Sequence, residues 1–467
     1  MKSSIWDGFQ ADWTNVFGQD WNVTPSDMEA CGAEIARAAG AAARIRESGC
    51  GPREGERVLF PHLPYLLQEK TLMPEEEIAA MKALSAECRG GFDAVLSVGI
   101  GGSYLGNQAL FDACCGPYWN LMTREARDGS PQVFFAGETA DPEALSSLLR
   151  YLRTQAEAKN GTYRVLTLVI SKSGTTVEPS GALSVLEREL PRFCDEARFA
   201  AVTDKAKGAL LAKCRERGWL HFTVPEGIGG RFSVFSQVGI VFASLLGLDI
   251  RAFLRGARLT EESCRSEDWR ENPALALAAM KYIASRNYGV TAEIVMPYCA
   301  RLRSLGGWYA QLLGESLGKK DTVDGRPAYG GRTPVCAVGT TDMHSLTQEH
   351  QEGRPNKLLQ FIAVEEPAAD LDFQLEERGR PCTVPMSRVM KAALRANAEA
   401  LASAHKMSCV LSIRKVNELY LGGLMYFFFL TIAYEGAMAG IDAYDQPGVE
   451  AYKKILHQDL AQYAGPV

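Results

Sequence analysis

Residues 164–176, RVLTLVISKSGTT, place an uninterrupted apolar run directly before a short turn that is crowded with hydroxyl side chains. The run from Arg164 to Ile170 has little polar alternation, which is typical of a strand buried on both faces. Such strands belong to parallel sheets that are covered by helices. The turn after such a strand lies at the carboxyl edge of the sheet, where open α/β proteins bind their ligands. This stretch therefore predicts both a fold class and the place of a site.

The same order of apolar run, loop and helical stretch recurs along the chain. We expect further strands at FDAVLSV from Phe92, RFAAVT from Arg198, LHFTV from Leu220, AEIVMPY from Ala292, PVCAVG from Pro334, LLQFIAV from Leu358 and CVLSI from Cys409. Strands that alternate with helices predict an α/β fold. Two mainly parallel sheets, each covered by helices on both faces, fit this pattern better than one very large sheet.

The predicted sheets divide the chain into two domains between two helical ends. Helix-start patterns near Ser26 and Pro74 indicate that the N-terminal portion is helical. No low-complexity linker marks the division near residue 250. The expected parts are an N-terminal helical segment at 1–65, a first α/β domain at 66–250, a second at 251–440 and a C-terminal helical segment at 441–467.

Composition and charge exclude several classes of function. The 467 residues are 46% hydrophobic and 23% charged, which is ordinary for a globular protein. The net charge of -6, without a cluster of Lys and Arg, gives no attraction for nucleic acid. The twelve cysteines are scattered except for Cys114–Cys115, so neither a disulfide scaffold nor a CxxC zinc site is predicted. We expect a small-molecule partner.

Two segments bear on location. The N-terminus, MKSSIWDGFQADW, has no apolar core of signal-peptide length, so we expect a cytoplasmic protein. Residues 419–441 are apolar for most of their length, but they contain Glu435 and several glycines and have acidic flanks. We interpret this segment as a buried core helix and expect no membrane partner.

The loop after the strand at Phe92 is rich in glycine: Gly99–Gly106, GIGGSYLG. Tyr104 occupies the third glycine position of GxGxxG and no Walker lysine follows, so neither nucleotide-binding pattern is met. Gly102 and the Ser103 hydroxyl could still approach an anion closely. Tight strand-to-helix turns also use glycine for steric reasons alone, so the residues leave both interpretations open.

The hydroxyl loop SKSGTT, residues 171–176, carries more hydroxyl groups than helix capping needs. A phosphate at a helix N-terminus would use backbone N–H groups, the helix dipole and several hydroxyl donors together. The missing Walker lysine argues against a nucleoside triphosphate, so a sugar phosphate is the favoured ligand. Four hydroxyl side chains surround Gly174, with Lys172 among them.

A third loop, Glu226–Ser233, presents one arginine, Arg231, on a glycine-rich turn. This permanently charged side chain could stabilise an oxyanion at a reacting carbon. It could equally hold two loops together through carbonyl oxygens. The residues alone do not decide between these roles.

Five stretches between Gly99 and Lys454 carry a more specific likeness: GIGGSYLG, SKSGTT, EGIGGRFS, YAQLLGESLGKK with VGTTDMHS, and YDQPGVEAYKK. Their residues and their order resemble the phosphoglucose isomerase family, which is built from two sugar isomerase (SIS) domains. The resemblance implies an aldose–ketose isomerase of glycolysis and gluconeogenesis. It would interconvert glucose 6-phosphate and fructose 6-phosphate through a cis-enediolate, without cofactor or metal.

The resemblance also implies roles for individual residues. Glu315 matches the base that carries the proton between C2 and C1, and Arg231 matches the arginine that stabilises the enediolate. On the residues alone, Glu315 with Lys319 four positions later would be an ordinary surface helix pair. His344 and Lys453 match groups associated with ring opening, and in the family the histidine comes from the neighbouring subunit. A homodimer with a shared active site is therefore expected.

The resemblance assigns the substrate's phosphate to Ser171, Ser173 and Thr176 with the backbone around Lys172, and Gly102 and Ser103 would contribute from the adjacent loop. Gln311 matches a glutamine near the sugar hydroxyls. Bifunctional phosphoglucose/phosphomannose isomerases tend to have threonine there, so Gln311 favours glucose specificity. Two positions depart from the family pattern: Pro447 stands where many relatives have tryptophan, and Glu138 lies in a loop that does not match.

Two other functions stay open at this point. A regulator with two SIS domains binds sugar phosphate without converting it and needs only the phosphate loops. The presence of Glu315, Arg231, His344 and Lys453 together favours an enzyme. The isomerase half of a glucosamine-6-phosphate-forming enzyme would normally follow an amidotransferase with an N-terminal cysteine, and Met1-Lys2-Ser3 offers none.

Overall fold

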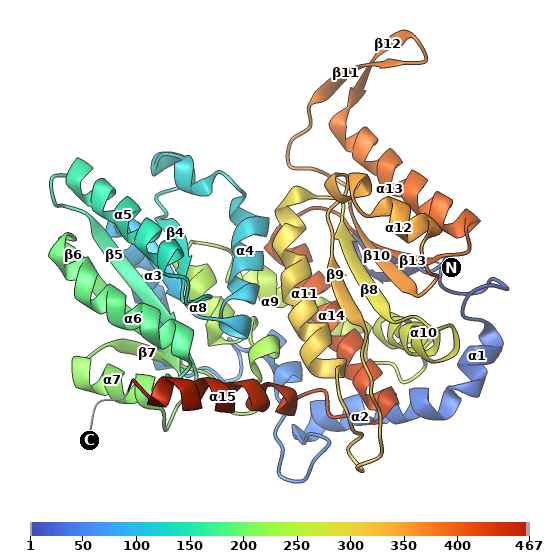
Figure 1. The fold of residues 1–467 in the computed structure, drawn as a ribbon, viewed down its shortest axis with the longest axis horizontal. Helices are drawn as coiled ribbons and strands as arrows, with labels where there is room; N and C mark the ends of the chain where they lie inside the picture. Colours follow the sequence, from blue (N-terminus) through green and yellow to red (C-terminus); the bar gives the residue numbers. More distant parts are fainter. Residues whose placement is uncertain (1, 464–467) are drawn as a thin grey trace.

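The structure is a computed structural model and describes residues 2–463. Two β-sheets lie side by side with a layer of helices between them, and further helices cover their outer faces (Figure 1). The predicted α/β class, with two mainly parallel sheets, is confirmed.

The first sheet contains five parallel strands in the order β4-β3-β5-β6-β7. All were predicted except β4 (Gln132–Ala136). The others are β3 (Ala94–Val98), β5 (Arg164–Ile170), β6 (Glu196–Thr203) and β7 (Leu220–Thr223). The helices of this half are α3 (Glu75–Gly91), α4 (Leu105–Cys115), α5 (Pro142–Ala158), α6 (Val177–Glu189), α7 (Ala209–Arg217) and α8 (Gln237–Leu245).

Alternate residues of β3 face opposite sides of this sheet. Ala94, Leu96 and Val98 pack in one cluster with apolar side chains of α5 and α6. Val95 belongs instead to the main core, which also contains side chains of α3, α4 and α8. Every residue of β3 is buried, as the lack of polar alternation in its sequence predicts.

The second sheet has the order β1-β2-β13-β10-β8-β9. Four parallel strands fall on predicted runs: β8 (Ala292–Pro297), β9 (Thr333–Cys336), β10 (Lys357–Val364) and β13 (Met407–Ile413). On one face, Ile294 and Phe361 pack against Leu394 and Leu401 of α13 (Met386–Ser403). The opposite face contributes to the main core, so this sheet is also covered on both sides.

The remaining two strands correct the prediction that residues 1–65 form a helical segment. β1 (Lys2–Trp6) and β2 (Phe9–Asp12) form a hairpin whose second strand pairs antiparallel with β13, with Asp12 opposite Val410. Phe9 and Ala11 are buried while Gln10 is exposed, a period of two over too few residues to recognise. The helical part begins only with α1 (Pro25–Ala30) and α2 (Gly32–Ser48).

The helices of the second half are α9 (Ile250–Ser263), α10 (Pro273–Asn287), α11 (Arg303–Leu317), α12 (Thr347–Glu352), α14 (Glu418–Ala439) and α15 (Glu450–Ala461). By length and composition α14 could cross a membrane, but 94% of its most apolar window is buried inside the protein. The predicted core helix is thus confirmed. The domain boundaries at residues 65, 250 and 440 stay predictions.

One hairpin stands away from the body of the molecule. β11 (Asp372–Glu377) and β12 (Arg380–Pro385) form a two-stranded ribbon that projects beyond α13 (Figure 1). Every residue of β11 is exposed. This projecting hairpin was not predicted from the sequence.

Candidate active site

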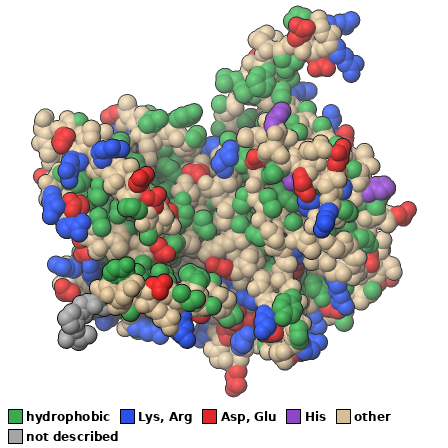
Figure 2. All heavy atoms as spheres, viewed as in Figure 1, with side chains coloured by type: hydrophobic (Ala, Val, Ile, Leu, Met, Phe, Trp, Pro, Cys, Tyr) green, Lys and Arg blue, Asp and Glu red, His purple; other side chains and the backbone are tan. Residues whose placement is uncertain are grey.

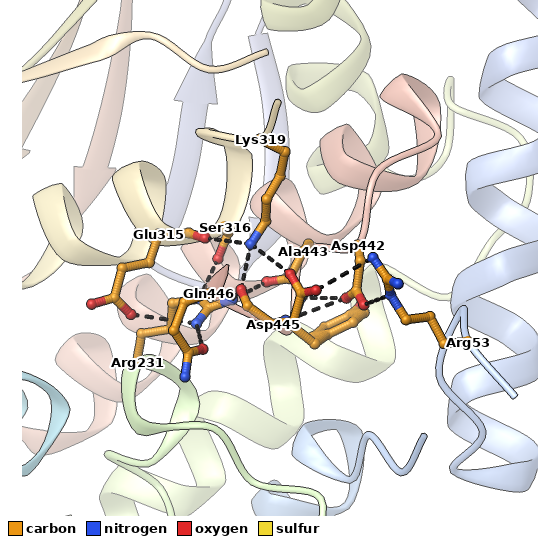
Figure 3. A network of polar contacts seen from close by, with 10 residues as sticks. Arg53, Arg231, Glu315, Ser316, Lys319, Asp442, Ala443, Asp445 and Gln446 are labelled. Carbon is orange, nitrogen blue, oxygen red and sulfur yellow. Dashed lines mark hydrogen bonds and ion pairs between the residues drawn. The ribbon is translucent and has the colours of Figure 1, made fainter. Parts of the chain in front are cut away.

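Arg231 lies at the centre of a dense polar network between the two sheets (Figure 3). It sits on a short 3₁₀ turn, Gly230–Phe232, and its side chain is only 1% exposed. Nε donates to the Ser316 hydroxyl at 2.7 Å, and Nη2 donates to the backbone carbonyls of Ala443 and Asp445, the latter at 2.8 Å. Burial lowers the pKa of Arg231 from its ordinary value, opposed by the nearby carboxylates, and the side chain remains a cation.

The third guanidinium nitrogen of Arg231 faces the predicted base. Nη1 donates to Glu315 Oε2 at 3.3 Å and to Gln446 Oε1 at 2.8 Å. Gln311, one turn before Glu315 on α11, donates from Nε2 to Glu315 Oε1 at 3.0 Å. Both carboxylate oxygens are therefore held, yet the Glu315 side chain is 31% exposed and can be reached from solvent.

Lys319 is not the surface partner that its spacing from Glu315 suggests. It is buried, and Nζ donates to the backbone carbonyl of Glu315 at 2.9 Å rather than to its carboxylate. Nζ also forms an ion pair with Asp445 Oδ1 at 2.9 Å. Burial lowers the pKa of Lys319, although Asp445 opposes the shift. The lysine thus joins the end of α11 to the segment after α14 (Figure 3).

The glycine-rich loop after β3 lies against the Arg231 turn. A Cβ at Gly102 would stand 2.0 Å from the carbonyl oxygen of Gly230, so only glycine fits there. The Ser233 hydroxyl donates to the carbonyls of Gly102 at 3.3 Å and of Gly230 at 2.6 Å. On the other side, a Cβ at Gly101 would stand 3.0 Å from Gln311 Nε2. The loop that contains Gly102 and Ser103 therefore borders the Glu315 cluster.

The hydroxyl loop curls over the start of α6. Ser171 Oγ accepts from the Gly174 N–H at 3.0 Å, and Ser173 Oγ accepts from the Thr175 N–H at 3.2 Å. Gly174 has a positive φ of 72°, which glycine adopts without strain. Thr176 is the N-cap residue of α6 but makes no side-chain capping bond. Ser173, Thr175 and Thr176 are exposed, so their hydroxyls face solvent at a helix N-terminus.

Lys172 connects this loop with the arginine turn. It lines a cavity of about 200 Å³ together with Gly227, Gly229 and Tyr444. β3 and β5 are neighbours in the sheet, so their following loops are adjacent as well. The structure thus gathers both glycine-rich loops and the hydroxyl loop around one site.

Two predicted residues are not brought to this site within one chain. His344 ends a 3₁₀ turn after β9 and is exposed. That turn lies near the end of β8, where Gly339 N–H donates to the Pro297 carbonyl at 3.0 Å. α11 also starts there, and Glu315 lies twelve residues along it, about 18 Å further on.

Lys453 lies on α15, where no side chain is buried, and its ammonium group pairs with Glu450 at 2.9 Å. The single chain therefore assembles Arg231, Glu315 and Gln311 but neither proposed ring-opening group.

The sequence analysis missed several residues of the network, among them Ser316, Lys319, Asp445 and Gln446. All four lie inside the stretches that carry the family resemblance. Their residue types are common on helix surfaces and in turns, so only the geometry distinguishes them. Pro447, the departure from the family pattern, begins the turn directly after Gln446.

Within residues 2–463, no group of three or more His, Cys, Asp or Glu side chains is placed to hold a metal ion. The expectation that the protein needs neither metal nor cofactor stays a prediction.

Comparisons with known proteins agree with this arrangement. The chain matches the phosphoglucose isomerase family over residues 74–368. It is 37% identical to the glucose-6-phosphate isomerase of Carboxydothermus hydrogenoformans over 413 residues, which cover 86% of this chain and 85% of that protein. It is 34% identical to the enzyme of the same name from Symbiobacterium thermophilum, over 83% of this chain and 84% of that one.

Solved structures show the same fold. The crystal structure of a glucose-6-phosphate isomerase from Chlamydia trachomatis superposes with a TM-score of 0.83 at 22% identity, over 99% of this chain and 89% of that one. A hypothetical protein from Thermus thermophilus gives 0.79 at 26% identity, over 97% of this chain and 100% of that one. With the matched family region and the relatives above 30% identity, the conclusion is direct: this chain belongs to the phosphoglucose isomerase family.

Proposed function

We infer that this protein interconverts glucose 6-phosphate and fructose 6-phosphate. The observation that carries the inference is the contact between Arg231 and Glu315, a fixed cation beside a reachable carboxylate, next to a loop with exposed hydroxyl groups. Such a pair is what an enediolate reaction requires, because a base must take a proton while a cation stabilises the resulting oxyanion. A protein that only binds sugar phosphate would need the hydroxyl loop alone.

The proposed reaction moves one proton between adjacent carbons. Glu315 takes the proton from C2 of the open-chain aldose, and the electrons of the broken C–H bond form the C1–C2 double bond. The carbonyl electrons move to O1, giving an enediolate that Arg231 stabilises. Glu315 returns the proton to C1 while the O2 proton passes to O1, which yields the ketose. No cofactor takes part in this balance.

The substrate's phosphate would bind at the N-terminus of α6. The donors are the exposed hydroxyls of Ser173 and Thr176, with Ser171 and the backbone around Lys172 beside them. The N-terminus of this 13-residue helix carries a partial positive charge that favours an anion. The Gly102 backbone and the Ser103 hydroxyl would contribute from the adjacent loop.

Glucose specificity belongs to the same proposal. Gln311 donates a hydrogen bond from Nε2 to Glu315, while its buried Oε1 has no hydrogen-bond partner within the described residues. That oxygen is free to accept from a sugar hydroxyl. Mannose 6-phosphate formation should therefore be slow, and equal rates with both hexose phosphates would contradict this part.

We further propose a cytoplasmic homodimer in which His344 of the partner subunit completes each site. Support comes from the position of His344 at the far end of α11 from Glu315. The projecting hairpin also exposes apolar side chains that a lone chain leaves in water, Leu371, Phe373 and Leu375. Figure 2 shows hydrophobic side chains gathered toward the base of the hairpin and charged side chains at its tip. Lys453 would reach the site by a movement of α15.

A heterodimer tests the shared site. Differently tagged Glu315→Gln and His344→Ala chains are co-expressed, and the mixed dimer is purified through both tags. If His344 acts across the interface, one of its two sites is intact and activity is about half that of the unaltered dimer. If His344 acts within its own chain, neither site is intact and the mixture stays inactive. Failure of the two tags to copurify would contradict the dimer.

The activity itself is tested with fructose 6-phosphate and a coupled nicotinamide-linked dehydrogenase that detects glucose 6-phosphate, with and without chelator. Rapid turnover that is insensitive to chelator is the expected result. No turnover, with fructose 6-phosphate still raising the melting temperature, would indicate a sugar-phosphate sensor instead.

A further inference from the structure

A second set of charged side chains is sealed inside the second half of the molecule. We call Lys281 (α10), Glu293 (β8), Tyr309 (α11), Arg332 and Glu435 (α14) the buried ion cluster. Lys281 and Glu293 have no exposed side-chain surface, and their Nζ and Oε1 atoms are 2.8 Å apart. Arg332 donates from Nε to Glu293 Oε2 at 2.7 Å and from Nη2 to Glu435 Oε2 at 2.8 Å. Two cations balance two anions.

Tyr309 connects this cluster to the helix that carries the proposed base. Its hydroxyl accepts from Lys281 Nζ at 2.7 Å and donates to Glu293 Oε1. Gln360 of β10 donates to the same hydroxyl at 3.2 Å and to the same carboxylate. Burial and the neighbouring Glu293 raise the pKa of Tyr309 well above its ordinary value, so the hydroxyl keeps its proton.

Stability alone is a weak reason for such a cluster. Removing charges from water costs free energy, and well-packed apolar side chains of similar volume often serve the fold as well or better. A buried cluster can instead fix one relative arrangement of the elements that contribute to it, because any shift leaves a charge without its partner.

The cluster joins α11, which carries Glu315, to α14, which precedes the segment whose carbonyls hold Arg231. Tyr309 lies six residues before Glu315 on α11. Glu435 lies eight residues before Ala443, whose backbone carbonyl accepts a hydrogen bond from Arg231. A rotation of α11 would swing Glu315 away from Arg231, and a slide of α14 would displace the carbonyls that hold Arg231. Both movements break bonds within the buried ion cluster.

We propose that the buried ion cluster positions α11 against α14 and thereby sets the spacing between Glu315 and Arg231 for proton transfer. Its members touch neither substrate nor reacting atoms, so they are positioning residues. The inference rests on the proposed isomerase function. Disturbing the cluster should lower kcat more than it raises KM, because the phosphate-binding loops belong to the other sheet.

The test is Tyr309→Phe, which removes one hydroxyl and leaves the ring. The matched control is Tyr426→Phe: Tyr426 of α14 donates to the fully buried Glu261 of α9 at 3.0 Å, a contact that does not involve α11. We expect similar losses of thermal stability in both variants. Turnover with fructose 6-phosphate should fall about tenfold at unchanged KM in Tyr309→Phe, because small misplacements of catalytic groups slow the reaction. It should stay within about twofold in the control.

A second variant, Gln360→Leu, keeps the test open if Tyr309→Phe fails to fold, because it removes only the bonds of Gln360 to the cluster. It should lower kcat in the same direction by a smaller factor. Unchanged kcat in both folded variants, or a change in KM alone, would overturn the inference while the isomerase stands. Absence of turnover in the unaltered protein would overturn the proposed function and this inference with it.

Discussion

The candidate site has two sides, the Arg231 network and the hydroxyl loop. They differ in how completely their side chains are hydrogen-bonded within the protein before substrate binds. Every nitrogen of the Arg231 guanidinium has a partner, and the group is buried. In the hydroxyl loop, the Ser171 and Ser173 hydroxyls accept from backbone N–H groups of the loop itself, and Ser173 and Thr176 face solvent. Groups that meet a developing charge act best when they are fixed in advance. Groups that bind a phosphate can exchange water for ligand at little cost. The comparison therefore predicts losses in kcat on one side and in KM on the other.

The largest effect is expected from Glu315→Gln, which keeps the shape of the side chain and removes the base. Turnover should fall by about 10³-fold or more, while fructose 6-phosphate still raises the melting temperature. Steady-state kinetics and thermal shifts measure the two properties. Glu76→Gln, at an exposed position of α3, is the control and should change neither. Turnover close to normal in Glu315→Gln would remove this residue from the reaction.

The second-largest effect is expected from Arg231→Lys, which keeps the positive charge but loses the planar guanidinium group with its several N–H donors. One ammonium group cannot reach Ser316, Gln446 and two backbone carbonyls together, so these acceptors lose donors. We expect kcat to fall about 10²-fold or more, and the free energy of unfolding to fall by about 2–3 kcal/mol. Kinetics and urea unfolding measure these losses. A purely structural arginine would lower stability and leave kcat unchanged.

A smaller effect, and one in KM, is expected on the other side of the site. Ser173→Ala with Thr176→Ala removes two proposed phosphate donors and should raise KM for fructose 6-phosphate about tenfold. Melting temperature and kcat should stay the same, because these hydroxyls are exposed. Ser184→Ala is the matched control, since this exposed hydroxyl also lies on α6 and donates to the Gly181 carbonyl of the same helix. A loss of kcat at constant KM would contradict the division between the two sides.

The smallest effect is expected at Glu56, a carboxylate that lines the same cavity as Gly229 and Phe232, which lie on either side of Arg231 in the sequence. Burial, with repulsion from Asp442 and Asp445, raises the pKa of the Glu56 carboxyl above its ordinary 4.5. The folded state therefore binds a proton more readily than the unfolded state, and stability is lost as pH rises through the raised pKa.

Glu56→Gln removes this dependence and should raise the melting temperature near neutral pH by on the order of 1 °C, with the gain disappearing below pH 4.5. Scanning calorimetry across pH measures the difference. Exposed Glu54→Gln should show no such trend, and a gain that persists in acid would contradict the assignment.

Sequence patterns predicted the buried parallel strands well, because a strand covered on both faces is apolar throughout. They failed for the hairpin of β1 and β2, where four or five residues cannot establish a period. β4 was missed as well, and in this strand Gln132, Phe134 and Phe135 are only partly buried.

In the site, the structure brings Arg231, Glu315 and Gln311 into contact, while the roles that the family resemblance implies for them stay predictions. Lys319 was not recognised, because a lysine four residues after a glutamate usually pairs at the surface, whereas here burial turns it toward a backbone carbonyl. His344 and Lys453 could not be placed from one chain, since their proposed roles depend on a second subunit and on movement of α15.

The pairing of β2 with β13 also sets an order of events during synthesis. β1 and β2, which end at Asp12, are synthesised before the first sheet but belong to the second, and their partner strand β13 begins only at Met407. The first sheet, whose strands lie between residues 94 and 223, can form while the N-terminal hairpin still lacks its partner. Closing so large a loop makes the second sheet the late step of folding. Until then its apolar strands have unpaired edges, which are prone to pair with another chain.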